Sequence, residues 1–206
     1  TLLPVRETAE AIRRTGCPAL FHCDAVQGFL KVPFTPARLG VDLLSVSGHK
    51  IYAPKGIGAL YVRKGLKLPP LIHGGGQERG LRSGTEATGQ IAAFAAAARL
   101  GAASMEEDIA WVAALKARTA ERLVQSVPGL TLLTQGGAPH ILSLSLSGYK
   151  SEVVVRFLSD RGVYLSSGSA CHRGKASHVF AALKLPKPLL NGALRVSFSN
   201  RTTQED

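Results

Sequence analysis

The stretch that decides the fold is residues 42–58, which read DLLSVSGHKIYAPKGIG. It begins inside an apolar run, Val41–Ser47, which is typical of a parallel strand covered on both faces. A Ser-Gly-His-Lys turn follows, at the strand end where open α/β sheets bind their ligands. Lys50 in this turn can be partly desolvated, and a desolvated lysine amine reacts with aldehydes to form a Schiff base. Taken alone, however, a lysine after a strand is more often a surface residue.

Helix and strand patterns alternate around this stretch. Val5–Arg14 is amphipathic with helical spacing, Leu20–Cys23 is a short apolar strand, and Gly58–Arg63 is a third strand. Two prolines, Pro33 and Pro36, interrupt the segment between the first two strands. The alternation predicts an α/β layer with a largely parallel sheet.

The second half of the chain has a different pattern. Thr88–Gln125 is rich in alanine and lacks proline, which predicts one long helix, or two with a break near Gly101. Shorter elements are expected after it: strands at Leu130–Leu133, Ile141–Leu146, Val163–Leu165 and Leu194–Phe198, and helices at Glu152–Asp160 and His178–Leu183. Thr202–Asp206 is typical of a helix N-terminus. We therefore expect two domains, residues 1–100 and residues 101–206.

Composition limits the classes of function. The 206 residues are 45% hydrophobic, and no apolar run approaches the ~20 residues of a membrane helix. No secretory signal opens the chain, and three cysteines are too few and too uneven for a disulfide framework, which favours a cytoplasmic protein. The net charge is +11, but the basic residues are scattered and aromatic residues are few, so nucleic acid is not expected as a direct partner.

A carboxylate follows the strand that precedes the central stretch. Residues 21–27 read FHCDAVQ, and Asp24 comes directly after a buried strand. A carboxylate there is costly unless it meets a cation, and the protonated nitrogen of a pyridine ring is such a cation. Gln27 lies three residues further on and can hydrogen-bond a ring hydroxyl. Without a cofactor lysine, the simpler interpretation is a helix N-cap at Asp24 and a surface Gln27.

Two more features belong to the candidate site. Ser47 and His49 flank Lys50 and can donate hydrogen bonds to a phosphate. Residues 73–86 read HGGGQERGLRSGTE, a concentration of glycine that can also mark a mobile surface loop.

One of the three cysteines lies in a segment of small residues. Residues 166–171 read SSGSAC, and basic residues follow Cys171 directly. Nearby cations raise the thiolate fraction of a cysteine, and a flexible loop allows a reactive sulfur to move. Free cysteines are more often buried and inert. A zinc site built from Cys17, His22, Cys23 and Cys171 would fit no usual ligand spacing, so no metal site is expected.

Together these motifs form a family pattern. DAVQ at 24–27, SGHK at 47–50, PKGIGALYVR at 54–63, the glycine-rich segment at 73–86, SSGSAC at 166–171 and LRVSFS at 194–199 resemble the cysteine desulfurases of aminotransferase class V. The resemblance runs from Pro4 to the last residue and corresponds to the carboxy-terminal part of such enzymes, without their amino-terminal half. It implies the pyridoxal-phosphate-dependent transferase fold type I, with part of a large, mostly parallel domain followed by a small α/β domain that carries the cysteine loop.

The resemblance implies roles around the cofactor. Lys50 would hold pyridoxal 5'-phosphate covalently. Asp24 would pair with the ring nitrogen and Gln27 with the ring oxygen, while Ser47 and His49 would bind the phosphate.

It also implies a reaction and partners. Thr85 would reach the cofactor of a neighbouring subunit, which implies a homodimer, and Arg195 would hold the substrate carboxylate. L-cysteine would be converted to L-alanine, with its sulfur captured as a persulfide on Cys171. An acceptor or scaffold protein would take that sulfur for iron–sulfur clusters or thiolation. Two alternatives remain: a selenocysteine lyase or other class V enzyme, and a non-catalytic module for dimerisation or scaffold binding.

Overall fold

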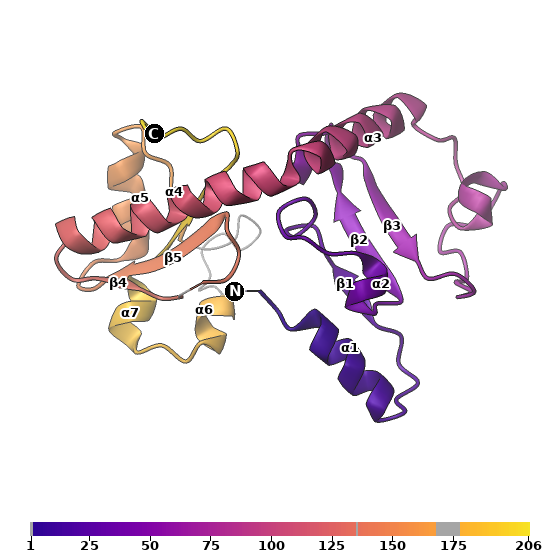
Figure 1. Ribbon diagram of the computed structural model, residues 1–206, viewed down its shortest axis with the longest axis horizontal. Helices are drawn as coiled ribbons and strands as arrows, with labels where there is room; N and C mark the ends of the chain where they lie inside the picture. The colour runs from indigo at the N-terminus through magenta and orange to yellow at the C-terminus, as the bar shows by residue number, and fades with distance from the viewer. Residues whose placement is uncertain (1, 135, 168–177) are drawn as a thin grey trace. The chain divides into compact units, whose positions relative to one another are not determined.

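The computed structural model describes residues 2–134, 136–167 and 178–206, and the chain divides into two compact units (Figure 1). The first unit runs from Leu3 to Met105. The second comprises Glu106–Asp206 together with the first two residues of the chain. Each unit is described by itself.

The first unit is a small sheet with short helices and one long helix. Its elements are α1 (Val5–Arg14), β1 (His22–Asp24), α2 (Pro36–Leu39), β2 (Leu43–Ser47), the 3-10 turn η1 (Gly48–Ile51), β3 (Gly58–Val62), the 3-10 turn η2 (Gln77–Gly80) and α3 (Thr88–Ala103). The prediction of a helix at Val5–Arg14 is confirmed, and all three predicted strands are present with slightly different ends.

The three strands lie in the order β1-β2-β3. β1 and β2 are parallel, with Asp24 opposite Ser45. β2 and β3 are antiparallel, with Ser47 opposite Gly58. The described sheet is therefore mixed, whereas the sequence predicted a largely parallel one. Parallel neighbours need a crossover of a dozen or more residues, and the shorter connection between β2 and β3 returns the chain antiparallel.

The central strand has two different faces. Leu44 and Val46 pack into a core with Cys23, Ala25 and Val41. The alternate positions of the same strands point to the opposite face, because successive side chains of a strand alternate. Those positions carry polar groups: His22, Asp24, Ser45 and Ser47. Leu43 shares this second face, and every residue of β2 is buried or half-buried, so one face is apolar and the other is mainly polar.

The second unit is an antiparallel sheet covered by helices. Its elements are α4 (Met105–Ser126), β4 (Leu130–Leu132), β5 (Ile141–Leu146), α5 (Ser151–Ser159), α6 (His178–Ala182), α7 (Lys187–Asn191) and β6 (Ala193–Ser197). β5 lies between β4 and β6 and is antiparallel to both. The core of this unit is Leu142, Leu144 and Leu194, with apolar side chains from α4 and α5 packed against it.

Several predictions for this half are confirmed and others are wrong. The long helical stretch is two helices, which meet at Ser104, close to the predicted break near Gly101. Val163–Leu165 is not a strand, because the pairing there is a single bridge between Ser166 and Arg195. The last residues, 202–206, form no helix, and the Asp206 carboxylate accepts hydrogen bonds from the N–H and hydroxyl of Thr203 instead.

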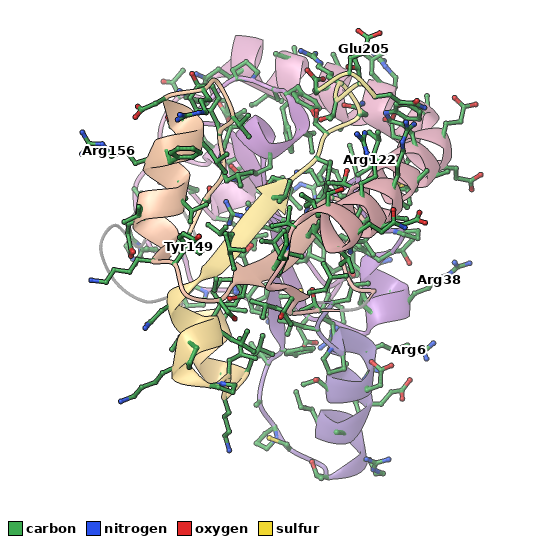
Figure 2. All side chains as sticks on the ribbon, turned by 90° about the vertical axis from the view of Figure 1, so that its left-hand side faces the viewer. Arg6, Arg38, Arg122, Tyr149, Arg156 and Glu205 are labelled. Carbon is green, nitrogen blue, oxygen red and sulfur yellow. The ribbon has the colours of Figure 1, made fainter. Side chains whose placement is uncertain are left out.

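The surface carries basic side chains on separate elements. Figure 2 shows Arg6 on α1, Arg38 on α2 and Arg156 on α5 extending outward from the ribbon. This distribution agrees with the scattered basic residues of the sequence. None of the helices in the described ranges is both long and apolar enough to cross a membrane.

Candidate functional site

The turn after β2 is fixed by close packing at Gly48. Its N–H donates to the Ile57 carbonyl oxygen at 2.8 Å, and a Cβ at this position would lie 2.7 Å from Ile57 Cγ2. Only glycine therefore allows the strand to turn here. Ile51, at the other end of the turn, is buried. Lys50 is consequently held on a backbone that is anchored on both sides.

Ser47 and His49 meet beside Lys50. The Ser47 Oγ and the His49 Nδ1 are 2.7 Å apart, a hydrogen-bond distance. Lys50 itself is half-buried, and no ion pair involves it within the ranges that the structure describes. The turn thus presents a hydroxyl, an imidazole and an amine, the donor types that an anionic aldehyde would need.

Asp24 lies at the end of the neighbouring parallel strand. Its Oδ1 accepts the Val26 N–H at 2.9 Å, which fixes the turn that carries Gln27. Because β1 and β2 are parallel, Asp24 and Ser47 lie at the same edge and on the same face of the sheet. The structure therefore places Asp24 of the DAVQ motif and Ser47 of the SGHK motif at one edge of the sheet.

Sequence reasoning missed a polar pair on this face. The His22 Nε2 and the Ser45 Oγ are 3.1 Å apart, and both residues precede the predicted site residues by two positions. The signal was available, because residues at i and i+2 of a strand share a face.

Sequence reasoning also missed a second lysine. Lys31 is half-buried, and burial lowers its pKa, with the positive charge of Lys50 lowering it further. The two lysines are separated by nineteen positions in the chain, so only the fold reveals that their charges interact.

Thr85 lies in the glycine-rich segment of the first unit and is exposed. The segment is ordered by its own hydrogen bonds, in which Gly84 N–H donates to Gln77 Oε1 at 3.3 Å and Ser83 Oγ donates to the Gly75 carbonyl at 3.2 Å. No described contact joins Thr85 to Lys50, so its predicted role stays a prediction.

Arg195 lies on β6, in the second unit. Its backbone N–H and C=O pair with Ser166, at 2.7 Å and 3.2 Å. Its Nε is buried and has no hydrogen-bond partner among the described residues. A buried guanidinium donor without an acceptor is costly, and a carboxylate is the ligand that best satisfies it.

The cysteines differ in their exposure and surroundings. Cys171 lies outside the described residues. Cys17 is exposed. Burial raises the pKa of Cys23, and the nearby Asp24 carboxylate raises it further, which lowers the thiolate fraction of this cysteine. Within the described ranges, no group of three or more histidine, cysteine or acidic side chains is arranged to hold a metal ion.

The family profile of aminotransferase class V matches residues 1–206. The chain belongs to the aminotransferase class V family. It is 40% identical over its whole length to a cysteine desulfurase from Gluconacetobacter diazotrophicus, and 38% identical over 99% of its length to one from Nostoc sp.. The chain spans about half of each of these two relatives, 52% of the relative's length.

Solved structures of the family have the same fold. A NifS-like protein superposes on the whole class V chain with a TM-score of 0.89 and 33% sequence identity, and the chain covers 54% of it. A NifS-like protein from Rickettsia africae gives a TM-score of 0.86 at 26% identity, again with 54% of that chain covered. The α/β architecture expected from the motifs is therefore confirmed.

Proteins of this family depend on pyridoxal phosphate. The residues present in this class V chain fit that group. The amine of Lys50, the hydrogen-bonded Ser47 and His49, and the Asp24 carboxylate lie at the carboxyl edge of two parallel strands, in a donor set suited to an aldehyde, a phosphate and a pyridine nitrogen.

Proposed function

We propose that this chain is the lysine- and cysteine-bearing part of a pyridoxal-phosphate-dependent cysteine desulfurase. One observation carries the proposal. A half-buried lysine in a turn that only glycine permits lies beside a serine–histidine pair, with a carboxylate on the same sheet face. The likeness to relatives named cysteine desulfurase supports it.

The roles follow from the chemistry of each side chain. Lys50 holds the cofactor covalently, and Ser47 and His49 donate to its phosphate. Asp24 keeps the ring nitrogen protonated, and Gln27 donates to the ring oxygen. When bound, pyridoxal phosphate supplies an electron sink for the substrate.

The substrate proposed is L-cysteine, with its carboxylate on Arg195. The buried Nε of that arginine, which has no hydrogen-bond partner among the described residues, supports this role. The carbon–sulfur bond of L-cysteine breaks while a sulfur–sulfur bond to Cys171 forms. The electron pair of the broken bond stays on carbon, which takes up the proton that Cys171 gives, so the products are L-alanine and a Cys171 persulfide.

The proposal includes partners and a compartment. Thr85 lies in an exposed, glycine-rich segment, which suits contact with the cofactor site of a second subunit in a homodimer. An acceptor or scaffold protein takes the persulfide sulfur for iron–sulfur cluster assembly or thiolation. We place the protein in the cytoplasm, where reduced thiols persist.

The first test is alanine release from L-cysteine by the intact protein with Lys50→Ala. We expect a loss on the order of a hundredfold or more, because the residue that reacts is removed. Lys55→Ala is the matched control, since Lys55 is an exposed lysine five positions further on. Parental activity in Lys50→Ala would exclude the proposed function.

The second test concerns Cys171, the residue proposed to take the sulfur from L-cysteine. Cys171→Ser should accumulate no protein-bound sulfane sulfur when L-cysteine is supplied, whereas the exposed Cys17→Ser should accumulate it as the parent does. Selenocysteine is the competing substrate in the same assay. A strong preference for it over cysteine would favour a selenocysteine lyase.

A further inference from the structure

A cavity of about 410 Å³ lies at the amino end of the β1-β2 pair, at the opposite edge of the sheet from Lys50. It is bounded by the last turn of α1, the segment that leads into β1, Asp42 before β2 and Arg63 after β3. Its volume falls within the range of small-molecule sites, roughly 300–1,000 Å³. The lining contains none of the residues proposed to bind the cofactor or the substrate.

The end of α1 brings two residues to this cavity. Gly16 N–H donates to the Arg13 carbonyl and Cys17 N–H donates to the Ile12 carbonyl, each at 3.1 Å, which is the Schellman pattern that closes a helix. Arg13 lies in the last turn of the helix. Because the chain folds back at this point, Cys17 lines the same cavity as Arg13.

Two arginines and one aspartate supply the charge of the lining, which is +1 in total. Arg13 Nη2 donates to the Gly40 carbonyl oxygen at 2.7 Å, and a Cβ on Gly40 would lie 2.5 Å from the same nitrogen, so the guanidinium lies directly against the backbone. Arg63 Nε donates to Asp42 Oδ1 at 2.7 Å. Each guanidinium has five N–H donors, and the hydrogen bonds among the described residues leave several of them available to a ligand.

The rest of the lining is largely apolar. Ala9 is buried, Ile12 is half-buried, and Leu20 is 51% exposed. An inorganic ion would leave these side chains in contact with water, whereas the hydrocarbon part of an organic acid would cover them. A single excess positive charge matches a monoanion, and planar guanidinium groups bind carboxylates through paired N–H donors.

We propose that this cavity binds a small carboxylate with an apolar body. Arg13 and Arg63 take the carboxylate, and Ala9, Ile12 and Leu20 cover the hydrocarbon part. The site is independent of the proposed function, since none of the cofactor residues takes part in it.

The test uses Cys17 as the reporter, because this cysteine is exposed and lines the cavity. The intact protein with its cofactor is treated with iodoacetamide, a neutral alkylating reagent, over a series of hexanoate concentrations at constant ionic strength. Mass spectrometry with peptide fragmentation gives the alkylation rate at Cys17 separately from that at Cys23. Two comparison compounds are 1-hexanol, which has the chain without the charge, and acetate, which has the charge without the chain.

We expect hexanoate to slow the alkylation of Cys17 several-fold at saturation, and 1-hexanol and acetate to have little effect at the same concentrations. Arg63→Met should raise the hexanoate concentration for half-protection by about tenfold, because charge-assisted hydrogen bonds are lost. Arg13→Met is a second variant with the same expected direction. Arg6→Met is the matched control, since Arg6 is an exposed arginine of α1 outside the lining, and thermal melting establishes folding in each variant.

Three results would overturn the inference while leaving the proposed function intact. The first is a rate of Cys17 alkylation that hexanoate leaves unchanged. The second is equal protection by 1-hexanol, which would identify an apolar crevice without recognition of an anion. The third is a parental response to hexanoate in both Arg63→Met and Arg13→Met.

Discussion

Charged side chains at the two ends of the β1-β2 pair differ in how completely they are hydrogen-bonded and ion-paired. At the amino end, Asp42 accepts the Phe21 N–H at 2.8 Å with one carboxylate oxygen and Arg63 Nε at 2.7 Å with the other. At the carboxyl end, Asp24 accepts one backbone N–H, and Lys31 and Lys50 interact without an ion pair in the described chain.

The difference separates a structural group from a reactive one. The Asp42 carboxylate is held by a backbone N–H and by an arginine, and so joins neighbouring segments of the chain. At the other end Lys31 and Lys50 are half-buried without an ion pair in the described chain, while Asp24 is exposed; proteins retain half-buried, incompletely paired groups where a ligand completes them. Substitutions at the two ends should therefore change different measurements.

The largest effect is expected for Asp24→Asn at the reactive end. Removing the charge proposed to pair with the ring nitrogen should weaken pyridoxal phosphate binding by about 3 kcal/mol, roughly a hundredfold. Fluorescence titration of the intact protein with the cofactor measures this. The melting temperature of the cofactor-free protein should stay close to that of the parent, and a large drop would mean that Asp24 is structural after all.

Gly48→Ala should lower both the free energy of unfolding and the incorporation of the cofactor. The added Cβ would lie 2.7 Å from Ile57 Cγ2, and overpacking of this kind costs about 2 kcal/mol of unfolding free energy. Because the turn holds Lys50, cofactor incorporation should fall as well. Gly56→Ala is the comparison for crowding, since the nearest atom to its added Cβ is 3.9 Å away, although its left-handed φ of 85° adds backbone strain. Equal cofactor loss in both variants would argue against a special role of the Gly48 contact.

Asp42→Asn should lower stability and leave cofactor binding unchanged. The Phe21 N–H, followed by Arg63, holds the pKa of Asp42 below its usual range. Its contribution is therefore present above the unfolded pKa of about 3.9 and is lost as the pH falls through the lower folded value. We expect a loss of about 1 kcal/mol by urea unfolding at neutral pH. The difference from the parent should shrink in more acidic solution, and a difference independent of pH would contradict this account.

The smallest effect is expected for Arg63→Met. The arginine side chain is 53% exposed, and an ion pair in such a position contributes about 0.5 kcal/mol, less at high salt. Unfolding at low and high salt measures it. A loss well above that of Asp42→Asn would show that the arginine stem, rather than its charge, holds the strands.

The sequence by itself determined the features that depend on neighbouring residues. Helical spacing predicted Val5–Arg14, an apolar run predicted Ile141–Leu146, and the alanine-rich stretch predicted helix, either as one long element or as the two that form. The motif around Lys50 was recognisable because turn, glycine and lysine are adjacent in the chain. Local periodicity and local chemistry require no knowledge of the fold.

The tertiary structure alone decided the features that join distant residues. The direction of β3 followed from a short connection, and the register of β1 with β2 is what put Asp24 opposite Ser45. Leu30 rests on Gly101, seventy-one positions away, and the pKa of Lys31 is lowered by burial and then further by the charge of Lys50. Charge and packing act through space, so residues that no sequence window contains together can still set each other's chemistry.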